Sequence, residues 1–310
     1  MPGRPHLRQR DREFLNLIGR YGYITMEHAK AFFGTKHYHW HRIKRLEEDG
    51  YIIRDRKGFI RLGPYGRDLV GIEMGVRLSS PQQLARRLEQ VEVDIYLRNL
   101  PVKWDWVPSF IVKKEDPSAY PNFCKFHGLL QNREAVYLVY LLASRPRKRT
   151  INQIKIELDR FNRSGYRKAI VFCKSPFVME LFGYSFLGLE ELHLLPYPHG
   201  TKLLIFLLPG TVQELGRILF GEIVIGENPQ ADFTVTMDGR KTDIWFLGTN
   251  DVTKLNRLKS YLRINYAGIT GVRRNAVLCL EQQRQRYEGQ LPGVPVYTFN
   301  LDEIMAKLVG

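Results

Sequence analysis

The segment TKHYHWHRIKRLEEDGYIIRDRKGFIRL, residues 35–62, decides the fold of the first part of the chain. Its first half predicts a helix over residues 35–49, which Gly50 ends because glycine readily adopts the left-handed backbone conformation found after a helix. Its second half predicts a basic hairpin, with strands at residues 51–53 and 59–62 around a polar turn. A helix followed at once by a basic hairpin is typical of the second half of a winged helix-turn-helix domain.

Two shorter helices are expected before this segment. Residues 8–21 carry an apolar stripe at helical spacing. Thr25 is a good N-cap for a helix over residues 26–33. The hairpin leads into a further short helix at residues 63–70. Three helices followed by a hairpin predict a winged helix-turn-helix, DNA-binding domain at residues 1–75.

The two faces of the helix at residues 35–49 predict which side chains meet DNA. At about 100° per residue, Trp40, Ile43, Leu46 and Glu47 fall on the side expected to pack inward. The opposite side is expected to enter the major groove, while the hairpin and the amino-terminal arm contact phosphates. The candidate DNA-binding residues are Lys36, His37, Tyr38, His41, Arg42, Arg45, Arg54, Arg56, Lys57, Arg61, Arg8 and Arg10.

The charge of the chain is consistent with a polyanionic partner. Lys and Arg number 47 against 32 Asp and Glu, a formal net charge of +15 over 310 residues. Residues 1–67 hold 15 of these cations and seven of the acids, so half the surplus lies in about a fifth of the chain. Net charge alone leaves open a basic protein with no nucleic-acid role. The partners we expect are double-stranded DNA, a replication or transfer protein, and a second copy of the chain in a homodimer.

The rest of the chain predicts an α/β arrangement. A linking helix is expected within residues 76–100, after which apolar strand patterns alternate with helical ones. Residues 122–175 and 232–281 follow one plan, in which a strand pair with a polar turn is followed by an apolar strand, a basic helix and another apolar strand. We therefore expect two related α/β units, at residues 101–210 and 211–310.

The histidine-rich string at residues 37–41 suggests a metal site. His, a bulky apolar residue and His form the metal-binding motif of endonucleases that nick replication origins, where a strand projects both imidazoles from one face. Here the string falls in a predicted helix, so His37 and His39 diverge. Two histidines on one helical face, His37 and His41, make a weak site. No metal is expected there.

The α/β units suggest a second kind of nuclease. Restriction-type nucleases hold Mg²⁺ with an Asp and with a second acid on the next strand, close to a Lys. The second unit offers Asp232 and Asp243, but Trp245 stands where the Lys is sought. The first unit has Asn122 in place of the Asp and a wholly apolar strand at residues 137–141. We expect two degenerate restriction-endonuclease-like units without catalytic residues, metal or cofactor.

Cysteine usage and hydropathy predict a cytoplasmic protein. Cys124, Cys173 and Cys279 show neither a disulfide framework nor metal-binding spacing, and their apolar surroundings favour small core residues. The longest apolar run, residues 203–208, is far too short to cross a bilayer and predicts a buried strand. The basic amino terminus lacks the apolar core of a signal peptide.

Several segments within residues 8–175 make the chain similar to the replication-relaxation family of plasmids and mobile elements. The resemblance implies a winged helix with a nuclease-like α/β domain behind it, and a DNA-binding role in plasmid replication, mobilisation or control. The chain departs from the family at Asn122 and in the strand at 137–141, which puts nuclease activity in doubt. The segments are RDREFL at residues 10–15, RIKRL at 42–46, GYI at 50–52, YGRDLV at 65–70, VEVDIYL at 91–97 and the tryptophan-containing stretch at 104–116.

Together these patterns predict a sequence-directed double-stranded DNA-binding protein of a plasmid or mobile element. It would act in replication, mobilisation or transcriptional control. Two other functions stay open, a metal-dependent DNA nickase or nuclease, and a protein-interaction factor or component resembling a phage terminal protein.

Overall fold

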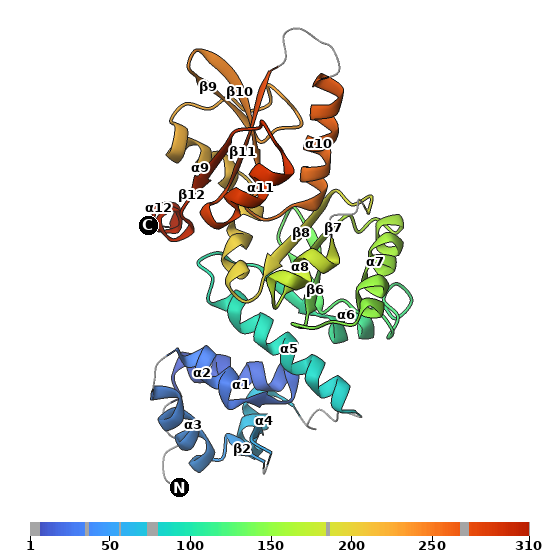
Figure 1. Cartoon of the computed structure of the whole chain (residues 1–310). Coiled ribbons are helices and arrows are strands. Elements are labelled where there is room, and N and C mark those ends of the chain that lie inside the picture. The colour runs from blue at the N-terminus through green and yellow to red at the C-terminus, as the bar shows by residue number, and fades with distance from the viewer. Residues whose placement is uncertain are drawn as a thin grey trace. The chain divides into compact units, whose positions relative to one another are not determined.

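The computed structural model describes residues 7–34, 37–55, 57–72, 80–183, 187–266 and 273–309. It shows a mixed α+β protein with three sheets (Figure 1), which confirms the expected fold class at that level. The chain divides into two compact units, residues 1–99 and 100–310.

The first unit contains three helices, a small sheet and two further helices. Strand β1 pairs antiparallel with β3, and β3 pairs antiparallel with β2, so β3 is central. The predicted helices and hairpin are present, and the sequence patterns missed only the two-residue strand β1. In chain order the elements are α1 (Gln9–Tyr21), β1 (Ile24–Thr25), α2 (Met26–Phe33), α3 (Tyr38–Glu48), β2 (Ile52–Arg54), β3 (Phe59–Leu62), α4 (Pro64–Val70) and α5 (Pro81–Arg98).

Local chemistry explains where the early helices begin and end. The Thr25 side chain accepts a hydrogen bond from the backbone N–H of His28 at 3.3 Å and caps α2. Gly34 ends that helix with φ of 75°, a left-handed conformation that favours glycine. Phe14 packs against Phe32 and Phe33 with ring centroids 5.3 and 4.8 Å apart, which holds α1 to α2.

The expected linking helix belongs to the first unit. Helix α5 packs on α1 and α2. The hydroxyl of Tyr21 donates to Asp94 at 2.9 Å, and Arg98 binds the same carboxylate at 2.6 Å. Because Asp94 is buried and needs these donors, α5 is fixed to α1 rather than acting as a free linker.

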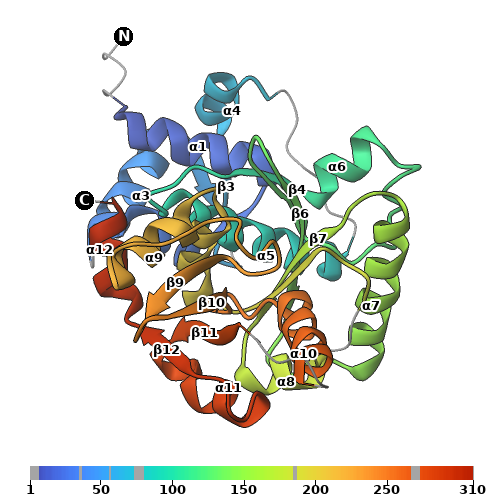
Figure 2. The ribbon, with the colours of Figure 1, turned by 90° about the horizontal axis from the view of Figure 1, so that it is seen from above.

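The second unit contains two sheets. In the first, β4–β5–β6 are antiparallel, and β7 and β8 continue parallel to β6. In the second, β9 is antiparallel to β10, and β11 and β12 continue parallel to it (Figure 2). The elements of the first sheet and its helices are β4 (Asp105–Pro108), α6 (Ser109–Glu115), β5 (Gly128–Gln131), β6 (Val136–Leu142), α7 (Lys148–Arg163), β7 (Lys168–Cys173), α8 (Pro176–Phe182) and β8 (Glu191–Pro196). The remaining elements are the 3₁₀ helix η1 (His199–Leu207), α9 (Thr211–Phe220), β9 (Phe233–Met237), β10 (Arg240–Phe246), α10 (Val252–Tyr266), β11 (Arg274–Leu280), the 3₁₀ turn η2 (Glu281–Gln283), α11 (Arg284–Gln290), β12 (Val296–Phe299) and α12 (Leu301–Val309).

The two sheets repeat one topology. Each has an antiparallel hairpin, a helix, a parallel strand, a second helix and a second parallel strand. Leu138 pairs with Ala169 in the first sheet as Ile244 pairs with Ala276 in the second. The plan expected from the sequence is present in part, because the apolar strand before each helix is the second strand of the pair, β6 or β10, and not a separate strand. The repeat extends further than expected, to β8 and β12.

One apolar segment differs from its prediction. Residues 203–208, expected to form a strand, lie mostly in the 3₁₀ helix η1, which begins at His199. A short apolar run does not by itself distinguish a strand from a buried helical turn. Gly200 packs closely on Leu195, since a Cβ added to Gly200 would lie 3.0 Å from the Cβ of Leu195. The chain in this segment coils back and packs on β8.

The three cysteines are buried and form no disulfide, as predicted for small core residues.

In the part of the chain that the structure describes, no single helix has the length and apolar composition of a membrane span. The pair η1 and α9, bent by 96°, meets those criteria only when both are counted together.

Candidate functional site

Helix α3 has a buried face and an exposed face. The buried side chains are His39, Arg42, Ile43 and Leu46, at the i, i+3, i+4, i+7 spacing of a helix that packs on one side. The exposed side chains form what we call the outer face of α3: His37, Trp40, His41, Lys44, Arg45 and Glu48.

Arg42 was predicted to face DNA, and this is wrong. Its side chain is 8% exposed, and its guanidinium binds both carboxylate oxygens of Asp11 on α1. That hydrogen bonding raises the pKa of Arg42. Asp11 also accepts from the backbone N–H of Arg8 at 2.8 Å. A buried carboxylate needs a charged partner, and Arg42 is the cation that α3 turns toward it.

Trp40 was predicted to pack inward, and this is wrong as well. Its side chain is 53% exposed, whereas Trp104, Trp106 and Trp245 are buried. The inward positions are filled by His39, Arg42, Ile43 and Leu46, so the indole is left on the outer face. The predicted and the observed buried faces both follow helical spacing, and they differ by a rotation about the helix axis.

The side chains of Arg8 and Arg10 contact residues of α2 and α3. Arg10 donates to the backbone carbonyl of Phe32 at 2.7 Å and lies over the Phe32 and Phe33 rings. Arg8 donates to the hydroxyl of Tyr38 at 3.2 Å, and the Tyr38 ring packs edge-on against Phe33. Both arginines are exposed, but these contacts tie α1 to α2 and α3.

Among the described residues of the hairpin, Arg54 is paired with an acid, whereas Lys57 and Arg61 are exposed cations. Arg54 binds Glu47 of α3 at 2.5 Å, and this hydrogen bonding lowers the pKa of Glu47. Lys57 and Arg61 are exposed. The other two predicted contacts, Lys36 and Arg56, lie outside the described residues. The predicted set that remains available to a ligand is His37, His41, Arg45, Lys57 and Arg61, to which the structure adds Lys44 and Trp40.

Local acids neutralise these cations only weakly. Lys44 lies 3.8 Å from Glu48 and Arg45 lies 3.9 Å from Asp49, both between side chains one helical turn apart. Exposed pairs of this kind contribute little, about 0.3–0.5 kcal/mol. The outer face of α3 presents two cations, one carboxylate, an indole and two imidazoles to solvent.

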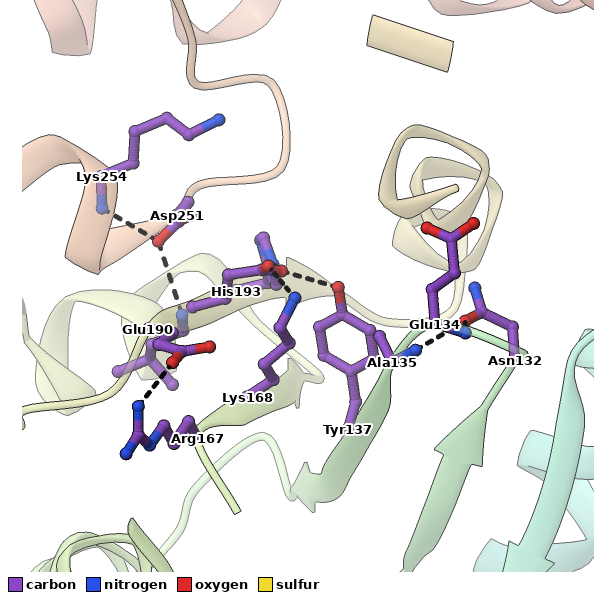
Figure 3. A network of polar contacts seen from close by, with 12 residues as sticks. Asn132, Glu134, Ala135, Tyr137, Arg167, Lys168, Glu190, His193, Asp251 and Lys254 are labelled. Carbon is purple, nitrogen blue, oxygen red and sulfur yellow. Dashed lines mark hydrogen bonds and ion pairs between the residues drawn. The ribbon is translucent and has the colours of Figure 1, made fainter. Parts of the chain in front are cut away.

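The second unit holds a polar cavity of about 390 Å³. Glu191 on β8 lines this cavity and accepts three hydrogen bonds, from the Tyr137 hydroxyl at 2.6 Å, from Lys168 at 2.5 Å and from His193 Nε2 at 3.1 Å. Figure 3 shows Tyr137, Lys168 and His193 converging from three adjacent strands. No local sequence pattern marks these residues as a site, because only strand register brings them together.

A second set of contacts joins this network to the second sheet. His193 Nδ1 lies 3.0 Å from the hydroxyl of Thr249. Asp251 accepts from the backbone N–H of Lys254 at the start of α10 (Figure 3). It also accepts from the backbone N–H groups of Thr253 and of Leu192 on β8. These bonds fasten the free edge of β8 to the segment before α10.

The protonation states favour a structural role for this network. Burial raises the pKa of Glu191, but hydrogen bonds from His193, Lys168 and Tyr137 outweigh it and lower the pKa overall. Burial and the adjacent Glu191 carboxylate hold the pKa of the Tyr137 phenol far above its usual value. Tyr137 is therefore a poor nucleophile and Glu191 a poor proton donor at neutral pH.

The two acids considered as metal ligands are occupied by other donors. Asp232 binds Lys254 at 2.7 Å and the backbone N–H of Phe246 at 2.7 Å. Burial tends to lower the pKa of Lys254, but Asp232 and Asp251 raise it overall, so it stays charged. Asp243 is fully buried and accepts from Thr234, Asn228 and Arg273. Across the described ranges, no three His, Cys, Asp or Glu side chains gather in a geometry that could hold a metal ion.

Comparison with protein-family models, with curated proteins and with solved structures finds no match.

Proposed function

We propose that this chain is a sequence-directed double-stranded DNA-binding protein and that its first unit is a winged helix domain. The observation that carries the proposal is the outer face of α3, which presents Lys44, Arg45, His37 and His41 with weak or no local neutralisation. The order α1–β1–α2–α3–β2–β3, with β3 central in the sheet, supports it because this order places a hairpin beside the third helix.

In this proposal the first turns of α3 enter the major groove, where residues near a helix N-terminus reach base edges. Lys44 and Arg45 on α3, and Lys57 and Arg61 on the hairpin, bind phosphates. Asp11 and Arg42 contribute indirectly, by fixing the rotation of α3 about its axis.

For the second unit we propose a nuclease-like scaffold without nuclease activity. The hairpin, helix and parallel strand of each sheet support the likeness, and the engagement of Asp232 and Asp243 with internal donors argues against catalysis. A role for a plasmid or mobile element remains a proposal that rests on the sequence resemblance.

Fluorescence anisotropy with labelled random-sequence duplexes at several salt concentrations tests DNA binding. Arg45→Ala is expected to weaken binding and to reduce the slope of log affinity against log salt by about 1, since one phosphate contact is lost. Arg163→Ala is the matched control, because Arg163 is an exposed helical arginine paired with an acid four residues away, Asp159. Duplexes incubated with Mg²⁺ or Mn²⁺ are expected to remain uncut.

Two results would overturn the proposal. One is the absence of duplex binding at low salt. The other is an Arg45→Ala variant whose affinity and salt slope equal those of the wild type.

A further inference from the structure

We infer that Trp40 recognises the 5-methyl group of a pyrimidine in the major groove, an inference that rests on the proposed DNA-binding function. Trp40 is the third residue of α3, within the turns that reach base edges in the proposed complex. Its indole is 53% exposed, while the other three tryptophans of the chain are buried.

The surroundings of Trp40 point to DNA rather than to an apolar protein surface. Its neighbours on the outer face of α3 are His41, next to it in sequence, and His37 and Lys44, about one turn away on either side. Contiguous exposed apolar patches larger than a few hundred Å² mark protein-interaction surfaces. On the outer face of α3, as defined by its six residues, the indole lies among two imidazoles, two cations and the carboxylate of Glu48.

Duplex DNA offers an apolar group within reach of such a helix. The major groove displays the C5 methyl of thymine among hydrogen-bonding groups, and apolar side chains read it by contact. The methyl of 5-methylcytosine occupies the same ring position. In the proposed complex the indole therefore contacts the C5 methyl group of one pyrimidine, while the neighbouring cations bind the phosphates of the two strands.

The test begins with selection of bound duplexes from a random pool by the full chain. In the recovered sequence each dT is replaced in turn by dU, which lacks only the methyl group, and each dC by 5-methyl-dC. For the wild type we expect an affinity change of about fourfold at one or two positions, the equivalent of one buried carbon. A loss on dT→dU alone identifies thymine, and a gain on methylation of dC alone identifies 5-methylcytosine.

Trp40→Ala is expected to bind more weakly and to lose this discrimination, while Trp40→Phe keeps part of it. Tyr65→Ala, which removes another exposed aromatic side chain of the first unit, from α4, is the control and is expected to discriminate as the wild type does. Circular dichroism of each variant checks that the fold is retained.

The outcomes separate this inference from the proposed function. If the wild type binds no duplex, the proposed function fails and the inference fails with it. If the wild type binds but no methyl substitution changes affinity, or Trp40→Ala still discriminates, the inference alone fails. It also fails if Trp40→Ala leaves DNA affinity unchanged and instead changes the sedimentation of the protein, which would assign Trp40 to contact between copies of the chain.

Discussion

Asp11 and Arg42 form a buried ion pair across 31 residues of sequence and join the start of α1 to the middle of α3. The pair sets the rotation of α3, because the guanidinium must face the carboxylate. Arg42 is thereby turned inward and Trp40 outward. The composition of the outer face is thus a consequence of an interaction on the opposite side of the helix.

Removal of either partner is expected to destabilise the first unit. Asp11→Asn or Arg42→Met should each cost about 3–5 kcal/mol, since each leaves a buried charge unpaired. The double variant Asp11→Leu with Arg42→Met should recover most of this loss. Hydrogen exchange of the α1 and α3 amides in the full chain measures the free energy of unfolding of each variant. Arg45→Met is the control and should cost less than about 0.5 kcal/mol; an equal effect of both arginine variants would contradict the structure.

The stability of the first unit should fall with acid because of His28. Burial lowers the pKa of this imidazole to about 4, and its Nδ1 accepts a hydrogen bond from the backbone N–H of Thr25 at 3.2 Å. Between pH 6.5 and 4 the unfolded chain binds a proton there and the folded chain does not. Stability is therefore highest above pH 6.5 and falls by about 3 kcal/mol as the pH reaches 4.

The control is His28→Gln, whose amide oxygen is able to accept the same hydrogen bond without titrating. In that variant the pH dependence of α2 hydrogen exchange, after correction for the intrinsic rate, should flatten between pH 6.5 and 4. An unchanged slope would assign the dependence to another group.

Glu191 should stabilise the second unit and make it sensitive to acid. Because its folded pKa lies below its usual value near 4.5, its contribution is complete above that pH and is lost as the pH falls further. Glu191→Gln should cost on the order of 1–3 kcal/mol at neutral pH and reduce the loss of stability in acid. Chemical denaturation between pH 3 and 7 measures both effects.

The neighbouring residue is a matched control. Glu190 pairs with Arg167 at 2.9 Å, but both side chains are about half exposed, so Glu190→Gln should cost less than about 1 kcal/mol. Equal costs at positions 190 and 191 would show that Glu191 is not held as the structure describes.

Tryptophan fluorescence should report the exposure of α3 directly. Acrylamide is expected to quench a fraction of the emission in the wild type, because Trp40 is exposed and the other three tryptophans are buried. Trp40→Phe should remove the quenched fraction of the emission, and Trp104→Phe should leave that fraction unchanged. If Trp40→Phe leaves the quenching unchanged, the indole is buried and the sequence-based orientation of the helix was right.

Local sequence was enough to predict the helices and the hairpin of the first unit, although it missed β1 and wrongly predicted a strand where η1 lies. The Thr25 cap, Gly34 and Gly50 mark the helix boundaries around α2 and α3, and the polar turn between residues 53 and 59 predicts the hairpin. Periodicity also predicted the repeated α/β plan, since both copies carry the same order of apolar strands and basic helices. These features depend on residues close together in the chain, so their chemistry is visible in the sequence.

Only the tertiary structure decided which side chains reach solvent and which are occupied. Arg42 is paired with Asp11 far earlier in the chain, Asp243 with Arg273 thirty residues later, and Glu191 with donors from β6, β7 and β8. The sequence predicts that a polar side chain needs a partner but not which partner the fold brings within reach. Burial makes an unpaired charge costly, and long-range packing therefore overrode the local expectation that charged residues face solvent and tryptophan faces the core.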